Sequence, residues 1–334
     1  MKVGELIDRL ETRSWQSVVV RLNRVSVSDD ATVLRIGDTY ELTLDEQALG
    51  ILARYLRIPA PYLKNCPEDY RAQTLRYWID RFSESDTVID FTDTSLLAMY
   101  APQKRPIPLD RIAGVVQMLF EVDDEVHTLI YDHKTIHVDV TSPEYSVTVP
   151  PRAGMPGRPG ADDVTTGGVR LLAWPHELRS PVLVAYLHRR HNNGGVSTEL
   201  EHGVISLKGR GVDEVVESME IEGTEILRGL PQMLQAYART AEMEVPGTPL
   251  GFATQLAREH NVPVRVRDSV MGLVNQLPGD ATVYDVTQAF VTVASNGATK
   301  YKTRLLLEKI GGLLTLDKDY VDSRCSTCEQ LLPL

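Results

Sequence analysis

The chain has 334 residues, a formal net charge of −11 at pH 7, 43% hydrophobic and 24% charged residues. This is the composition of water-soluble globular proteins, and it excludes a disordered chain, a collagen-like chain and a disulfide scaffold. The negative charge excludes a uniformly basic, nucleic-acid-binding surface, although local basic patches remain open. No apolar run approaches the roughly 18–20 residues that span a bilayer, so we expect no membrane association. No secretory signal is visible and only three cysteines occur, which favours a reducing cytoplasm.

The first eighty residues change from a strand pattern to a helix pattern. Residues 15–42 alternate β-branched and polar side chains, with a hairpin turn expected at Gly37. Thr43 and Glu46 have the spacing of a capping box, which predicts a helix from there. A second helix is predicted from Pro67. The segment 54–81 holds six basic residues and three acids, which fits a solvated helix face.

Later residues continue the mixture of strands and helices and then become helical. The patterns predict strands at 87–91 and 95–100, a helix at 105–120, a hairpin at 127–140, strands at 145–149 and 169–174, a helix at 180–191 and a strand at 203–209. They then predict helices at 213–243, 249–260, 268–277, 282–295 and 300–310, with Thr282 and Asp285 spaced as a cap.

This order predicts an α+β fold, a mostly antiparallel sheet with flanking helices and a helical C-terminal part. We expect an α+β domain at 1–210, with a flexible Pro/Gly-rich loop at 150–168, because that loop has few apolar side chains to offset its ordering entropy. A helical region at 211–320 and a tail at 321–334 complete the chain.

The common catalytic signatures are absent. The sequence has no phosphate loop, no dinucleotide fingerprint, no G-x-S-x-G, no H-E-x-x-H and no EF-hand loop. The sequence therefore identifies no catalytic residue and no cofactor, and favours a function without catalysis.

Basic residues gather in two segments that could bind nucleic acid. The candidates are Arg179, His188, Arg189, Arg190, Lys208 and Arg210 in the first segment, and Lys300, Lys302 and Arg304 in the second. Tyr301 lies among the second group, and single-strand binding combines aromatic with basic side chains. The alternatives are a helix C-terminus, where cations suit the dipole, and an ordinary amphipathic helix. Arg152 and Arg158 of the 150–168 loop could contact phosphates or a protein partner. The alternative is that they belong to an ordinary surface loop.

Metal ligands are present only as weak candidates. Cys325 and Cys328 form a C-x-x-C pair, but a structural zinc site needs four ligands. The remaining zinc ligands could be Cys66, or His188 and His191, which lie three residues apart on the expected helix. The hairpin residues Asp132, His133, His137 and Asp139 are better explained as a polar strand face.

Four segments together resemble the DUF932 family of phage and plasmid proteins. They are LTLDEQALGILARYLRIPAPYLKNCPEDYRAQTLRYWI, LLAMYAPQKRPIPLDRIAGVV, VRLLAWPHELRSPVLVAYLHRRHNNGGV and ATVYDVTQAFVTVASN, in the family's order across roughly residues 40–310. The family's cysteine near 190–193 is missing here, Tyr284 stands in place of a tryptophan, and Gln288 in place of an asparagine. The resemblance implies a phage or mobile-element context and the cytoplasm of a host cell, and it supplies no catalytic residues.

We therefore expect a phage or mobile-element accessory protein that binds single-stranded DNA or RNA in recombination or replication. The alternatives are a factor that binds a host or phage protein without catalysis, and a metal-dependent enzyme using the histidines. The acidic segment 213–225 suits the basic groove of a second copy, which makes a homo-oligomer plausible.

Overall fold

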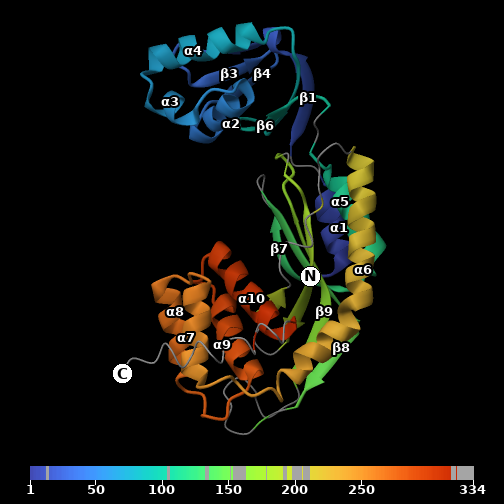
Figure 1. Ribbon diagram of the computed structural model, residues 1–334. Coiled ribbons are helices and arrows are strands. Elements are labelled where there is room, and N and C mark those ends of the chain that lie inside the picture. Colours follow the sequence, from blue (N-terminus) through green and yellow to red (C-terminus); the bar gives the residue numbers. More distant parts are fainter. Residues whose placement is uncertain are drawn as a thin grey trace.

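The computed structural model describes residues 1–12, 15–103, 106–131, 135–150, 152, 163–177, 179–190, 194–197, 205, 211–316 and 321. In this part of the chain the α+β class is confirmed (Figure 1). The helices are α1 (Val3–Glu11), α2 (Glu46–Leu56), α3 (Ala60–Asn65), α4 (Glu68–Arg81), α5 (Leu109–Leu119), α6 (Val212–Arg239), α7 (Pro249–Glu259), α8 (Val264–Val274), α9 (Val283–Ser295) and α10 (Tyr301–Leu316). The strands are β1 (Gln16–Arg21), β2 (Val25–Val27), β3 (Val33–Ile36), β4 (Tyr40–Thr43), β5 (Asp86–Phe91), β6 (Leu96–Tyr100), β7 (Glu125–Tyr131), β8 (Ile136–Val149), β9 (Asp163–Ala173), β10 (Val182–Arg189) and β11 (Gly194–Ser197).

Residues 15–100 build a part with its own hydrophobic core. Its strands form two antiparallel sheets in the orders β1-β5-β6 and β2-β3-β4, and α2, α3 and α4 pack with them (Figure 1). The predicted hairpin turn is confirmed, because Gly37 lies between β3 and β4 with a φ of 57°, a conformation that glycine adopts without strain.

The start of α2 corrects the predicted capping box. Thr43 is the last residue of β4, and Asp45 caps the helix instead, its Oδ1 accepting from the backbone N–H of Ala48 at 2.8 Å. A strand that runs into a helix through two residues leaves Thr43 in the ladder, so its side chain is not at the helix end. The predicted cap of α9 is confirmed: Thr282 and Asp285 form a capping box.

The centre of the molecule is an antiparallel sheet in the order β11-β10-β9-β8-β7. Helices α1, α5 and α6 cover one face with apolar side chains (Figure 1). The sheet curls, helped by irregular register in β7–β8 and β8–β9. Close backbone approach is tightest at Gly168, where a Cβ would lie 1.9 Å from the carbonyl oxygen of Val140.

Strand β10 overturns the helix predicted over 180–191. Val182–Arg189 pairs with β9 on one side and β11 on the other, and every side chain in it is buried. A short, continuous apolar run is the pattern of a strand buried on both faces, and periodicity alone does not separate it from a buried helix. The correction also removes the shared helical face proposed for His188 and His191.

Helices α7 to α10 pack around a third hydrophobic core at the opposite end of the molecule from residues 15–100, with the curled sheet between (Figure 1). α6 begins at Val212, near the predicted boundary, and packs along the sheet. Within the described residues, no helix combines the length and apolar character needed to cross a membrane.

Candidate nucleic-acid interface

The sheet face opposite α1, α5 and α6 carries a group of polar side chains. Side chains alternate along a strand, so the valines and leucines of β8 and β9 that pack on these helices leave their neighbours on the other face. Those neighbours include His137 and Asp139 of β8 and Arg170 of β9. Tyr186 and His188 of β10 belong to the same face, and the guanidinium of Arg170 lies over the Tyr186 ring, 4.7 Å from its centre, in a cation–π contact.

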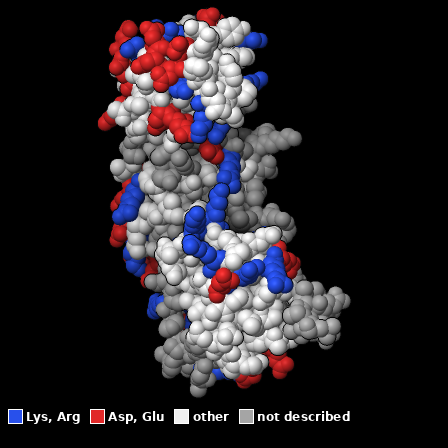
Figure 2. All heavy atoms as spheres, turned by 90° about the vertical axis from the view of Figure 1, so that its left-hand side faces the viewer, with Lys and Arg blue, Asp and Glu red and all other residues white. Residues whose placement is uncertain are grey.

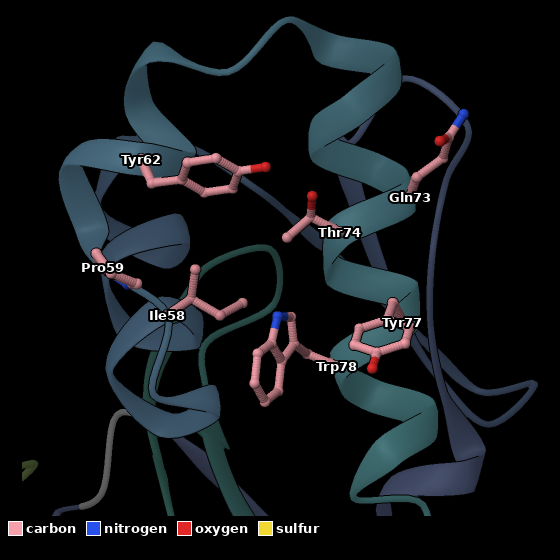
Figure 3. A pocket seen from close by; sticks show the side chains of 7 residues that line it. All are labelled: Ile58, Pro59, Tyr62, Gln73, Thr74, Tyr77 and Trp78. Atoms are coloured by element: carbon pink, nitrogen blue, oxygen red, sulfur yellow. The ribbon is translucent and has the colours of Figure 1, made fainter.

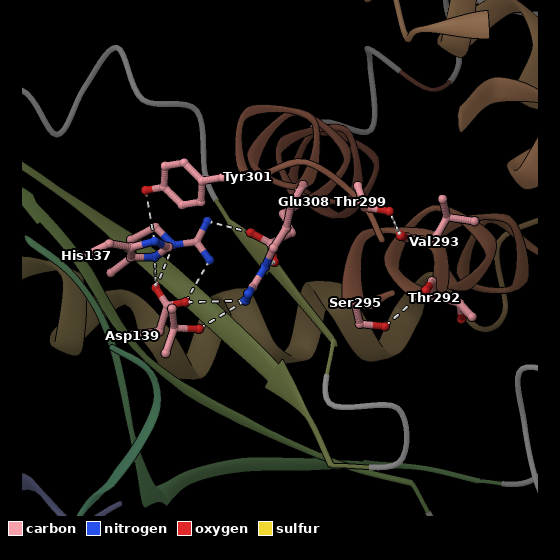
Figure 4. A network of polar contacts seen from close by, with 11 residues as sticks. His137, Asp139, Thr292, Val293, Ser295, Thr299, Tyr301 and Glu308 are labelled. Atoms are coloured by element: carbon pink, nitrogen blue, oxygen red, sulfur yellow. Dashed lines mark hydrogen bonds and ion pairs between the residues drawn. The ribbon is translucent and has the colours of Figure 1, made fainter. Parts of the chain in front are cut away.

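A buried ionic network occupies the middle of this face (Figure 4). Asp139 Oδ1 accepts from Arg170 Nε at 2.6 Å and from His137 Nε2 at 2.8 Å, and its Oδ2 accepts from Arg170 Nη2 at 2.9 Å. Arg170 Nη1 lies 2.7 Å from Oε2 of Glu308 in α10. Burial opposes ionisation of Asp139, but the charge of Arg170, the neighbouring His137 and the hydrogen bonds from both together outweigh it and hold the pKa of the carboxyl well below its usual range.

The network anchors the N-terminal half of α10 to the sheet. Arg304 donates from Nε to Glu308 at 2.8 Å and from Nη2 to Thr128 of β7 at 3.0 Å. The hydroxyl of Tyr301 is hydrogen bonded to Nδ1 of His137 at 3.0 Å, and burial raises the pKa of Tyr301 to about 12. These contacts fix the position of the exposed Lys300 and Lys302 at the start of the helix.

Two histidines from strands that are not neighbours in the sheet stack on each other. The rings of His127 in β7 and His188 in β10 lie 3.5 Å apart between centroids and 14° from parallel, although β8 and β9 separate their strands in the sheet. His127 Nε2 is hydrogen bonded to Thr141 of β8 at 2.6 Å. Burial lowers the pKa of His188 to about 3, helped by His127, Arg304 and Arg190, and burial also lowers the pKa of His127. Both rings are therefore neutral at pH 7.

Cations gather on this side of the molecule. Figure 2 shows Lys and Arg side chains in a line from the part formed by residues 15–100 toward the helical C-terminal part. The predicted residues Arg190, Lys300 and Lys302 are exposed, and the Arg304 side chain is 26% exposed. Arg190 and Arg304 both act electrostatically on His188, so the two predicted segments meet at the stacked histidines. We call Arg190, Lys300, Lys302 and Arg304 the cationic face.

Other predicted residues lie elsewhere. Arg189 is 2% exposed; it pairs with Asp163, and its Nη1 donates to Gln288 of α9 at 2.7 Å, so it is a buried cation and not a surface contact. Arg179 is exposed, with its guanidinium 3.7 Å from the ring centre of Trp174. Arg152 pairs with Asp280 in the turn before α9.

Several predicted residues fall outside the described part of the chain. They are Asp132, His133, Arg158, His191, Lys208, Arg210, Cys325 and Cys328. Among the residues that the structure does describe, no group of three or more His, Cys, Asp or Glu side chains is placed to hold a metal ion. His137 and Asp139, considered as metal ligands from the sequence, instead belong to the ionic network.

Sequence reasoning missed Arg170 and His127. The signal for Arg170 is a single charge inside the apolar strand VRLLA, because a buried cation needs a partner, and its register partner is Asp139. His127 begins a predicted hairpin, but its stacking on His188 depends on a curl that strand patterns do not reveal.

Sequence reasoning also missed an aromatic pocket in the part formed by residues 15–100. It has a volume of about 530 Å³ and lies between α3 and α4 (Figure 3). Its lining residues are Ile58, Pro59, Tyr62, Gln73, Thr74, Tyr77 and Trp78. The basic residues of segment 54–81 were recognised from the sequence, but α3, which supplies Tyr62, was not.

No protein-family model, no curated protein and no solved structure matches the chain. The DUF932 resemblance therefore rests on the quoted segments alone and remains an expectation.

Proposed function

We propose that the protein is a phage or mobile-element accessory protein that binds single-stranded nucleic acid on the cationic face, in recombination or replication. The observation that carries the proposal is the line of Lys and Arg side chains on one side of an acidic molecule (Figure 2). Phosphate contacts supply most of the affinity for nucleic acids, and they require cations that gather locally rather than a positive net charge.

The acids of α6 lie on the other side of the sheet from this face. The acid-rich first half of α6 contains Asp213, Glu214, Glu217, Glu220, Glu222 and Glu225. α6 covers the sheet on the side away from the viewer of Figure 2 (Figure 1). The negative charge of α6 is thus separated from the cationic face by the thickness of the sheet.

The construction of the face also supports binding. Arg170 pairs with Asp139 and Glu308 inside the protein, so its charge is balanced there. Lys300 and Lys302 are exposed at the start of α10, which the network holds in place. An anchored helix loses less side-chain and backbone entropy when phosphates bind it than a free segment does.

Fluorescence anisotropy with labelled single strands and duplexes across a salt series tests the proposal. We expect the affinity to fall steeply as the salt concentration rises. In a plot of log binding constant against log salt concentration, each phosphate contact of a single strand makes the slope more negative by about 0.7. The double variant Lys300→Glu/Lys302→Glu weakens binding and flattens the slope. Arg228→Glu/Arg239→Glu, with the same charge change on exposed positions of α6, leaves both unchanged.

Equal effects of the two double variants would contradict the assignment of the face. No binding of any nucleic acid at low salt would contradict the proposed function. The protein would then be examined as a factor that binds a host or phage protein, alone or as a homo-oligomer.

A further inference from the structure

The pocket between α3 and α4 is built from aromatic rings that the core does not use. α4 packs on the core of its own part through Ala72, Leu75 and Ile79, which share one side of the helix. Tyr77 lies off that side and is 62% exposed, and Tyr62 of α3 is 54% exposed. Large aromatic side chains left in water beside a pocket are typical of a surface that binds something.

One wall of the pocket is held in place by an aromatic contact. Tyr62 projects from α3 toward α4, Trp78 projects from α4 toward Ile58, and a gap separates the two rings (Figure 3). Trp78 is held in place because it stacks on Phe82 with 6.1 Å between centroids and 21° between planes. Thr74 lies on the side of α4 that faces the gap, whereas the amide of Gln73 points away from it (Figure 3).

The charge around the pocket suits an anionic chain. Arg81 lies over the Trp78 ring, 5.0 Å from its centre, and is exposed. Arg57 ends α2 in a left-handed conformation directly before Ile58, and its side chain is exposed. Flat apolar walls beside exposed guanidinium groups match a planar ring carried on a phosphate backbone.

We propose that this pocket receives one unstacked base of the single-stranded nucleic acid, between Tyr62 and Trp78. Thr74 offers its hydroxyl to the edge of the base, and Arg57 and Arg81 meet the flanking phosphates. The inference rests on the proposed function and adds a base-binding pocket to it, which requires strands with free bases, since the bases of a duplex remain stacked and paired.

The test compares two oligonucleotides of equal length and equal phosphate number, oligothymidylate and an abasic oligomer. Base stacking on aromatic side chains predicts that the wild type binds oligothymidylate about 5- to 150-fold more tightly. Tyr62→Ala and Tyr77→Ala reduce this preference and keep the affinity for the abasic oligomer. Tyr70→Ala is the matched control, because Tyr70 is also on α4, is 61% exposed and lies outside the pocket lining.

Trp78 supplies a second measurement. Oligothymidylate quenches the tryptophan emission of the wild type and of Tyr70→Ala, whereas the abasic oligomer does not. Quenching that disappears in Trp78→Leu and persists in Trp174→Leu assigns the signal to the pocket.

The outcomes separate the two proposals. Equal affinity for both oligomers, or loss of the preference in Tyr70→Ala as well as in Tyr62→Ala, overturns the base pocket and leaves nucleic-acid binding intact. Absence of binding to either oligomer overturns the proposed function and the base pocket with it. Binding of a proline-rich peptide to the pocket, with no preference between oligomers, would assign the aromatic rings to a protein partner instead.

Discussion

Acidification should destabilise the curled sheet through the stacked histidines. His188 has a folded-state pKa of about 3, against an unfolded value of 6.5, so the unfolded chain takes up the proton first. A lowered histidine pKa gives stability that is present above the unfolded value and is lost as the pH falls from there toward the folded value. When the pH is lowered from about 7.5 to about 5, the proton uptake of His188 alone should reduce the free energy of unfolding by about 2 kcal/mol. The lowered pKa of His127 adds in the same direction.

Urea unfolding followed by circular dichroism, at both pH values, measures this loss. His188→Gln removes the titrating ring and keeps a polar side chain of similar length. We expect the variant to be less stable than the wild type at the higher pH, because it loses the stacking on His127, and to lose about 2 kcal/mol less on acidification. A variant that loses as much stability as the wild type between the two pH values would refute the reasoning.

Three further substitutions test the fold. Arg170→Met leaves two buried carboxylates without their shared cation and should cost about 3–5 kcal/mol in urea unfolding; a cost under about 1 kcal/mol would mean that the network is not formed. Gly168→Ala places a Cβ against a β8 carbonyl and should lower the melting temperature, whereas Gly50→Ala in α2, with open space around it, should keep or raise it. Asp45→Ala removes the cap of α2 and should cost about 1 kcal/mol, while Thr43→Ala should cost clearly less; the reverse order would restore the sequence-based cap.

Local patterns in the sequence predicted much of the architecture. The alternation at 15–42, the Gly37 turn and the capping box of Thr282 and Asp285 all appear in the structure, because each depends on residues close together in the chain. Strand β10 was mistaken for a helix because its burial on both faces is set by β9 and β11, which the local pattern does not contain.

The candidate site was predictable only in part. Lys300 and Lys302 were identified as cations, but their place beside the curled sheet depends on contacts such as Tyr301 with His137, 164 residues apart. Arg189 looked like its neighbour Arg190 in sequence. Arg189 is the last residue of β10 and is buried against Asp163, whereas Arg190 lies in the turn that follows the strand and is exposed.

The most direct test of the central claim is the salt dependence of binding to a short oligothymidylate and to a duplex of the same length. We predict tight binding of the single strand at low salt, a steep loss of affinity as salt rises, and weaker binding of the duplex. Salt-independent binding, tighter binding of the duplex, or no binding at low salt would contradict a single-strand-binding role for the cationic face.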